Sequence, residues 1–261
     1  MTISKNGAVL LTLEDWQRLG GPKKPEQWVD GRSAKEAARA WLTAESGRMP
    51  AEVVAALEGS SAFGSVIGWA AEPEVRLPFD SFDGEPRNTD LLVIARDQHG
   101  PYLIAVEAKA DEPFSETVSE TLVGATERYL KTDRSKGIAR VLQLGQALLG
   151  PMETGEPEIG SLRYQLLTAV AGALCEGERR NIGRVLVLIQ EFVTARSRDV
   201  RHDHNRKDLN SFVTRLSHGR VKAIGHGEIC GPFEVPGAPI LRNAPALFIG
   251  KVVRRLRSQA K

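Results

Sequence analysis

The chain has 261 residues, of which 41% are hydrophobic and 26% are charged, proportions that are ordinary for a globular protein. No apolar run approaches the roughly 20 residues that span a bilayer, and the first residues do not resemble a secretory signal, so neither a membrane protein nor a secreted one is expected. The two cysteines, Cys175 and Cys230, exclude a disulfide scaffold and a four-cysteine zinc site. A reducing, cytoplasmic location is therefore predicted.

Charge is distributed unevenly along the chain. Residues 1–178 contain 18 Lys and Arg against 27 Asp and Glu, a net charge of −9, whereas residues 179–261 contain 17 against 6, a net charge of +11. A basic segment joined to an acidic body predicts a polyanionic partner, most simply nucleic acid. The alternative is a basic surface that only increases solubility.

The first third of the chain is predicted to be mostly helical. Residues 1–33 have a mixed pattern and are expected to form an N-terminal extension. Helices are predicted at 34–45, with Ser33 as the cap, and at 51–59. A short, edge-like strand is expected at 74–80, because a proline interrupts it.

Two strongly apolar strands are predicted next, at 89–96 and 102–110, joined by a tight connection at 97–100. Nearly every position in these strands is apolar, so other elements should cover both of their faces. The following elements are predicted helices at 115–131, 135–149 and 161–177 and a buried strand at 183–193.

The basic last third has a looser pattern. A helix is predicted near 204–217, and short strands are predicted at 220–229 and 246–253. The sequence His202-Asp203-His204 suggests a metal site, but a solvated helix start, capped by Asp203 or Asn205, explains it better.

These elements predict one α/β domain with a central mixed sheet of about four to five strands flanked by helices. Residues 34–195 would form its core, and residues 196–261 would form a basic C-terminal elaboration packed on that core.

Asp90, Glu107 and Lys109 carry the chemical signal in the two apolar strands. If the strands close symmetrically over the connection, Asp90 lies directly opposite Glu107, with Cβ atoms roughly 4.5–5.5 Å apart. Lys109 shares their face, because side chains repeat every second residue along a strand. A slip of one residue would break this arrangement, so the prediction depends on the turn.

Two carboxylates that face each other in an apolar hairpin repel each other and are costly to bury. A divalent cation would compensate both charges, and oxygen ligands from Asp90, Glu107 and the carbonyl of Ala108 suit Mg²⁺, with Mn²⁺ as a substitute. Lys109 would then position or polarise an attacking water. The alternative is a solvated strand end in which Lys109 forms an ion pair with Glu107 or Asp90.

The segments TDLLVIA, which contains Asp90, and YLIAVEAK, which contains Glu107 and Lys109, resemble the core of the PD-(D/E)XK nuclease superfamily, the restriction-endonuclease-like fold. The resemblance covers roughly residues 34–195 and implies an αβββαβ core. It also implies a Mg²⁺-dependent nuclease that hydrolyses phosphodiester bonds in DNA. One departure is Thr89, which stands where the family motif has proline.

The resemblance implies two further groups in the site. An acid from the first helix would be Glu36, Glu52 or Glu58, and the sequence does not choose among them. A polar residue on the helix after the Glu-x-Lys strand would be Gln165, within the stretch LRYQLL, where the neighbouring Tyr164 is equally well explained as a core aromatic.

Arginines are the candidate nucleic-acid contacts: Arg163, Arg196, Arg198 and Arg201. Restriction, phage defence and repair are all compatible biological settings, and a homodimer is one alternative for the oligomeric state. The alternative function is a catalytically silent nucleic-acid-binding or assembly module on the same fold. A third is an α/β protein with no nucleic-acid role and solvated hairpin acids.

Overall fold

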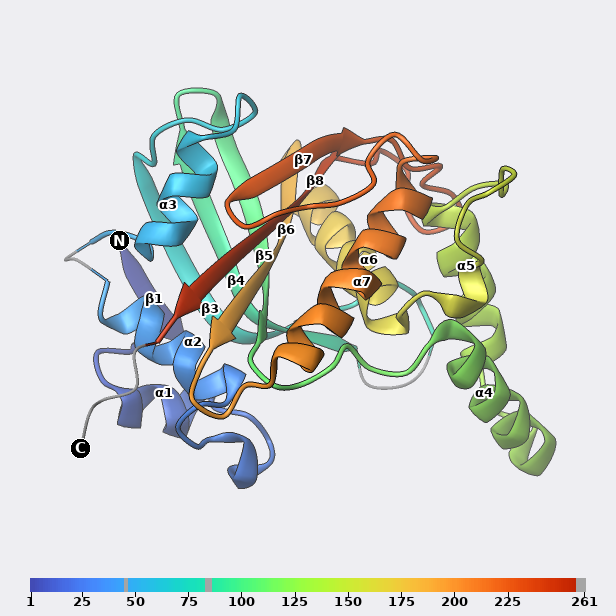
Figure 1. Ribbon diagram of the computed structural model, residues 1–261, viewed down its shortest axis with the longest axis horizontal. Helices are drawn as coiled ribbons and strands as arrows, with labels where there is room; N and C mark the ends of the chain where they lie inside the picture. Colours follow the sequence, from blue (N-terminus) through green and yellow to red (C-terminus); the bar gives the residue numbers. More distant parts are fainter. Residues whose placement is uncertain (45–46, 83–85, 257–261) are drawn as a thin grey trace.

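The computed structural model describes residues 1–44, 47–82 and 86–256, and within them the chain forms one mixed sheet covered by helices (Figure 1). The sheet has eight strands in the order β2-β1-β3-β4-β5-β6-β8-β7. The strands are β1 (Thr2–Lys5), β2 (Ala8–Val9), β3 (Gly68–Leu77), β4 (Arg87–Asp97), β5 (Gly100–Lys109), β6 (Arg184–Val193), β7 (Glu228–Phe233) and β8 (Ala246–Arg255). The predicted α/β class with a mixed sheet is confirmed.

The sheet is larger than the four to five strands predicted, because both ends of the chain add strands to it. Strands β3, β4 and β5 form an antiparallel meander, and β6 runs parallel to β5. Strand β1 pairs with β3 on one side, and β8 pairs with β6 on the other. The short N-terminal strands lie in a segment whose mixed pattern gave no alternation to detect.

Seven α-helices are described: α1 (Leu13–Gly20), α2 (Ser33–Leu42), α3 (Ala51–Glu58), α4 (Val118–Thr132), α5 (Gly137–Leu148), α6 (Tyr164–Arg179) and α7 (Asp199–Leu216). Three of them differ from the predictions. Helix α2 begins at Ser33 itself, with Arg32 at the N-cap position and no side-chain cap, so the predicted Ser33 cap is wrong. Helix α1 was missed, although Thr12 and Asp15 form a capping box at its start. Helix α7 begins at Asp199 instead of near residue 204, with Arg198 at the N-cap position. Asn205 therefore lies inside the helix, where its side chain bonds the backbone of Phe114 and Glu112 instead of capping a helix.

The sheet separates two hydrophobic clusters. One contains Trp16, Trp41 and Leu57 from α1, α2 and α3, and the other contains Leu144 and Phe212 together with the apolar residues of α6. Figure 1 accordingly shows α1–α3 on one side of the sheet and α4–α7 on the other. Helices therefore cover both faces of β4 and β5, as the continuous apolar pattern of these strands predicts.

The tight connection between β4 and β5 is fixed by a buried carboxylate. Asp97 pairs with Gly100 across the strands, and its side chain accepts hydrogen bonds from the amides of Gly64 (2.9 Å) and His99 (2.8 Å) and from Arg184 on β6. Burial alone would raise the pKa of Asp97, but these donors outweigh it and lower the pKa to about 2. The turn that sets the hairpin register is therefore anchored to the next strand of the sheet.

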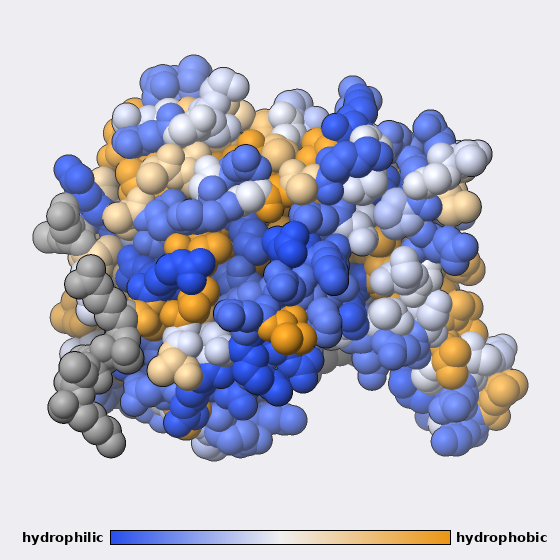
Figure 2. Space-filling view, viewed as in Figure 1, coloured by the Kyte–Doolittle hydropathy of each residue, from blue (hydrophilic) through white to orange (hydrophobic). Residues whose placement is uncertain are grey.

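Helix α4 presents apolar side chains to solvent, among them Val123 and Leu130, which are 60% and 79% exposed. Figure 2 shows hydrophobic residues at this end of the molecule, whereas hydrophilic residues cover the region over α7. No helix in the described ranges is both long and apolar enough to cross a bilayer.

Candidate active site

The β4–β5 hairpin has the register predicted from its turn. Pairs run from Asp97–Gly100 to Leu91–Val106, so the next residues, Asp90 and Glu107, continue the same alignment. Beyond the last backbone pair, the Asp90 carboxylate takes the place of a backbone acceptor, and its Oδ2 accepts a hydrogen bond from the amide of Ala108 at 2.7 Å. The two acids therefore meet at the open end of the hairpin.

A third carboxylate, Glu74 on β3, lies in the same row. Its neighbours Pro73 and Val75 pair with Leu91 and Thr89, which places Glu74 beside Asp90. Its φ of 48° lies in the left-handed region, which is unusual for a non-glycine residue and is typical of functional or strained positions. Sequence reasoning did not identify Glu74 as a site residue.

These acids line one cavity of about 530 Å³. Its wall includes Lys109 and Gln165 from the other elements of the site, and residues of the N-terminal segment such as Lys24 and Arg32 close one side of it. The volume falls within the range of about 300–1,000 Å³ that is usual for ligand sites. The cavity therefore combines the three carboxylates of the strands with those of Glu26 and Glu112 and with several cationic side chains.

Glu107 is buried, with 4% of its surface exposed, and is surrounded by donors. Arg87 pairs with its Oε2, and both Lys109 Nζ (2.9 Å) and Gln165 Nε2 donate to its Oε1. Burial alone would raise the pKa of Glu107, but the charges of Arg87 and Lys109 outweigh burial and hold the pKa below its usual value. Glu107 is therefore a stable anion.

Asp90 has the opposite electrostatic environment. Burial and repulsion from Glu107 raise the pKa of Asp90 to about 8, against the weaker opposing effect of Lys109. Burial also raises the pKa of Glu74, and its hydrogen bond from Asn88 (3.1 Å) only partly offsets this effect. The carboxyl group of Asp90, with a pKa displaced this far and a position in the cavity wall, is the kind of group found at functional sites.

Helix α6 brings Gln165 to the acids. Just before the helix, Arg163 forms an isolated β-bridge with Thr117, and the amide of Tyr164 donates to the carbonyl of Glu116 at 3.0 Å. Gln165 then lies in the first turn, where its Oε1 accepts from Lys109 Nζ at 3.2 Å. The structure therefore brings together Asp90, Glu107, Lys109 and Gln165, which are four of the predicted site residues.

A family model matches residues 10–255, nearly the whole chain, and its description is "Domain of unknown function (DUF6946)". The chain belongs to this family. No curated protein and no solved structure matches the chain. The family description names no activity, so a function has to be inferred from the chemistry of the site.

The three candidate helix acids do not line the cavity. Glu36 on α2 is buried and accepts hydrogen bonds from the amide of Gly31 (2.7 Å) and from Arg39. On α3, Glu52 accepts hydrogen bonds from Gln190 and Arg254, and Glu58 accepts one from the hydroxyl of Ser65 at 3.5 Å. The third acid beside the pair comes instead from a strand, as Glu74.

The candidate arginines lie at the same edge of the sheet as the site. Because β5 and β6 run parallel, the loop after β6 follows the same edge as Lys109. Arg198 in this loop pairs with Asp111 (3.4 Å), two residues after Lys109, and Arg163 donates to Asp208 (2.9 Å) and to the carbonyl of Ser115 (3.2 Å) at the cavity. Arg196 is exposed, and Arg201 is half-buried in the first turn of α7.

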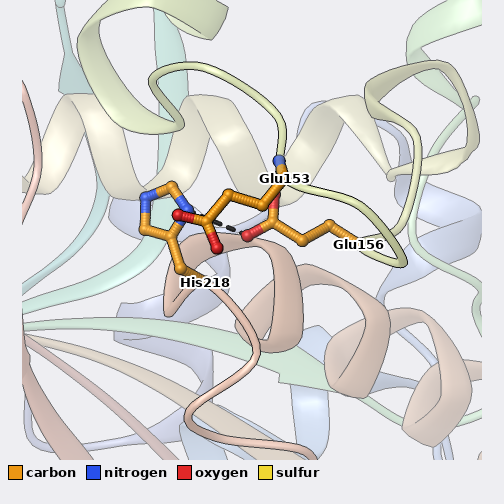
Figure 3. Close-up of side chains that lie close together, drawn as sticks. All are labelled: Glu153, Glu156 and His218. Atoms are coloured by element: carbon orange, nitrogen blue, oxygen red, sulfur yellow. Dashed lines mark hydrogen bonds and ion pairs between the residues drawn. The ribbon is translucent and has the colours of Figure 1, made fainter.

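One group of possible metal ligands lies elsewhere among the described residues: Glu153, Glu156 and His218 (Figure 3). Glu156 is almost buried and accepts hydrogen bonds from His218 (2.8 Å) and from the amide of Glu153 (3.0 Å), and it pairs with Arg215 (3.0 Å). The Glu153 amide and these two side chains lower the pKa of Glu156 despite its partial burial. Protein donors already satisfy this carboxylate, so the cluster is explained as an ion-pair network.

Proposed function

We propose that this protein is a Mg²⁺-dependent nuclease that hydrolyses phosphodiester bonds in DNA. The observation that carries the proposal is the pair of carboxylates, Asp90 and Glu107, which are aligned across the hairpin and line a cavity together with Lys109. The order α2-β3-β4-β5-α6-β6 is similar to the αβββαβ core that the sequence resemblance implies, with α3, α4 and α5 as insertions.

The donor set of the cavity fits a hard divalent cation. Mg²⁺ prefers carboxylate oxygens and retains several waters, and Glu74, Asp90 and Glu107 supply such oxygens from three adjacent strands. The raised pKa of Asp90 indicates crowded negative charge that a cation would relieve. When bound, Mg²⁺ would supply a water of lowered pKa and compensate the charge of the phosphate.

Lys109 and Gln165 would act on the attacking water. Lys109 Nζ is held by Glu107 at 2.9 Å and by Gln165 at 3.2 Å, so two hydrogen bonds orient its ammonium group inside the cavity. Phe114 packs beside this group, with Nζ 5.2 Å from the ring centroid. A fixed ammonium group at this position would hold the water in place and would stabilise negative charge on the phosphate.

The partner in this proposal is DNA, bound through its phosphates. Arg196, Arg198 and Arg201 would contact the strand beside the cavity, within the segment that carries the basic excess of the chain. Binding should then weaken with salt, with a slope of log K against log salt of about −0.9 per phosphate neutralised on a duplex. Charge reversal at the three arginines should flatten the slope, and binding that does not respond to salt would contradict a phosphate-mediated complex.

Cleavage can be tested with single-stranded, duplex and branched DNA substrates in Mn²⁺, Mg²⁺ and EDTA. We expect metal-dependent products from at least one substrate and none from Asp90→Asn. The matched control is Asp203→Asn, which changes an exposed acid on α7 and should leave cleavage intact. Products that persist in Asp90→Asn would come from a contaminating nuclease and would contradict the proposal.

The alternative is a catalytically silent nucleic-acid-binding module, and the contact between Arg87 and Glu107 favours it. The guanidinium group lies against Glu107 Oε2, the oxygen that would otherwise bind the metal ion. Arg87 therefore compensates part of the negative charge that a cation would neutralise. A silent module would bind DNA without cutting it. In that case Arg87→Gln should increase Mn²⁺ affinity, whereas Arg128→Gln on the exposed α4 should not.

A further inference from the structure

A second cavity, of about 350 Å³, adjoins the carboxylate cavity. Ser115 and Gln165 line both, and Arg87 connects them because its guanidinium group pairs with Glu107 while the side chain forms part of the second wall. A molecule whose reacting group lies at Asp90 could therefore extend directly into this space.

The walls of the second cavity are aromatic. Phe79, Phe82 and Tyr164 line it, and the guanidinium group of Arg140 lies 5.9 Å from the centroids of both phenylalanine rings. Asp80 fixes this guanidinium group by accepting two hydrogen bonds, from Nε and Nη2. Aromatic rings and arginine planes are the surfaces on which unpaired nucleobases stack.

Two polar atoms in this cavity wall lack a partner. Asn88 Oδ1 and Arg87 Nε are buried and have no hydrogen-bond partner among the residues that the structure describes. Asn88 Nδ2 donates to Glu74, which fixes the orientation of the amide and leaves Oδ1 as a free acceptor. Both residues line the cavity, so a bound base could supply a donor to one atom and an acceptor to the other, and buried polar groups are otherwise nearly always paired.

We propose that this cavity holds an unpaired base of the DNA strand whose phosphate lies at Asp90 and Glu107. Tyr164 would stack on the base, while Asn88 Oδ1 and Arg87 Nε would bond its edge. Tyr164 and Gln165 are consecutive in the first turn of α6, so one helix turn would position both the base and the attacking water. The inference rests on the proposed function and adds that the substrate is single-stranded, frayed or locally opened DNA at the point of cleavage.

The test compares two fluorescent 12-mer oligonucleotides, one of thymidine nucleotides and one of abasic sites, with Ca²⁺ in place of Mg²⁺ to limit cleavage. The two strands carry the same phosphates, so the electrostatic part of binding is shared. We expect the thymidine strand to bind about tenfold to a hundredfold more tightly, which is the effect of stacking one or more bases. Equal binding would overturn the base cavity while leaving the proposed nuclease intact, and no binding of either strand would overturn both.

Two variants test whether the difference in affinity between the thymidine and abasic strands arises in this cavity. Tyr164→Leu should bring the ratio of the two affinities close to one, while binding of the abasic strand stays at the parental value and reports a folded protein. Tyr129→Leu is the matched control, because Tyr129 is exposed on α4 and lies outside both cavities. If the ratio in Tyr164→Leu stays at the parental value, the bases bind elsewhere and the inference is overturned.

Discussion

Asp90 and Glu107 face each other across the β4–β5 hairpin, yet their surroundings shift the pKa values of their carboxyl groups in opposite directions. Glu107 has three donors around it, two of them cationic, whereas among the described residues the Asp90 carboxylate accepts its hydrogen bond from the backbone amide of Ala108. The two acids should therefore respond differently to mutation, although each would contribute to the same metal site.

For Asp90→Asn we expect a protein that is more stable than the parent at pH 8 in EDTA. The pKa of Asp90 is near 8 in the folded protein and about 3.9 in an unfolded chain, so between these values the folded state binds more protons. The free energy of unfolding of the parent must then fall as the pH rises through this window. The asparagine side chain does not titrate, so the substitution removes this pH dependence and should increase the free energy of unfolding by at least about 1 kcal/mol at pH 8.

Thermal unfolding of both proteins from pH 5 to pH 8 measures this effect. Asp203→Asn provides the control, because this exposed acid has a lowered pKa and cannot produce the same slope. Parallel pH profiles for the parent and Asp90→Asn would show that Asp90 is ionised throughout.

Glu107→Ala should destabilise the protein by about 3 kcal/mol in EDTA, because removing one partner of a buried ion pair leaves the others unpaired. Arg87 and Lys109 would both lose their carboxylate. Urea denaturation checks this value against Glu58→Ala, which changes an exposed acid and should stay within about 0.5 kcal/mol of the parent. An equally stable Glu107→Ala protein would mean that the ion pairs contribute nothing to folding.

Divalent-metal affinity should increase with pH up to about 8 and then level off. Mg²⁺ requires ionised carboxylates, and Asp90 is mostly protonated below its pKa, so metal binding should release a proton there. The association constant for the metal should rise by at most about tenfold per pH unit, because binding releases a single proton. Calorimetry in two buffers of different ionisation enthalpy measures the proton released, and an affinity that is independent of pH from 6 to 8 would contradict a role for Asp90 as a ligand.

Lys109→Ala should separate metal binding from catalysis. The substitution removes a cation beside the carboxylates, so Mn²⁺ affinity should stay the same or increase slightly. Cleavage should fall by about 10²–10⁴, the usual contribution of a positioned acid–base group. Lys109→Arg should not restore it, because a planar, permanently charged guanidinium group cannot replace a compact ammonium. An active Lys109→Ala protein would show that Lys109 serves only as the ion-pair partner of Glu107.

The alignment of Asp90 with Glu107 could be predicted because it depends on local information. A tight connection joins the two strands, and once Asp97 pairs with Gly100 every later pair is determined. The apolar pattern of both strands also indicated that helices would cover them. Sequence was sufficient here because turn geometry and strand periodicity act over only a few residues.

Glu74 could not be found in the same way. A long connection separates β3 from β4, and a loop of that length does not determine how the two strands align. In addition, Glu74 has a left-handed conformation, which no residue type in this segment signals. The odd-numbered residues of β3 also change sides at this point. Before Glu74, Trp69 packs in the hydrophobic cluster with α1–α3, whereas after it Leu77 packs in the cluster on the opposite side of the sheet.

The choice among the helix acids was also beyond sequence reasoning. Helical periodicity places Glu36 on the buried face of α2 but does not reveal its partner. In the structure its carboxylate bonds the amide of Gly31 and the side chain of Arg39, so it stabilises the start of its own helix. Such contacts depend on how a preceding loop folds back, which a single sequence does not encode in a readable pattern.

The anchored turn at Asp97 has a consequence for how this protein can evolve. Seven residue steps of about 3.3 Å separate Asp97 from Asp90, so the turn determines the alignment of the acids from roughly 23 Å away. Inserting or deleting a single residue in the turn would move Glu107 to the opposite face of the sheet, although neither acid had changed. The length of this turn is therefore under the same selection as the acids themselves, and lineages that retain the chemistry should tolerate substitutions in the turn more readily than changes in its length.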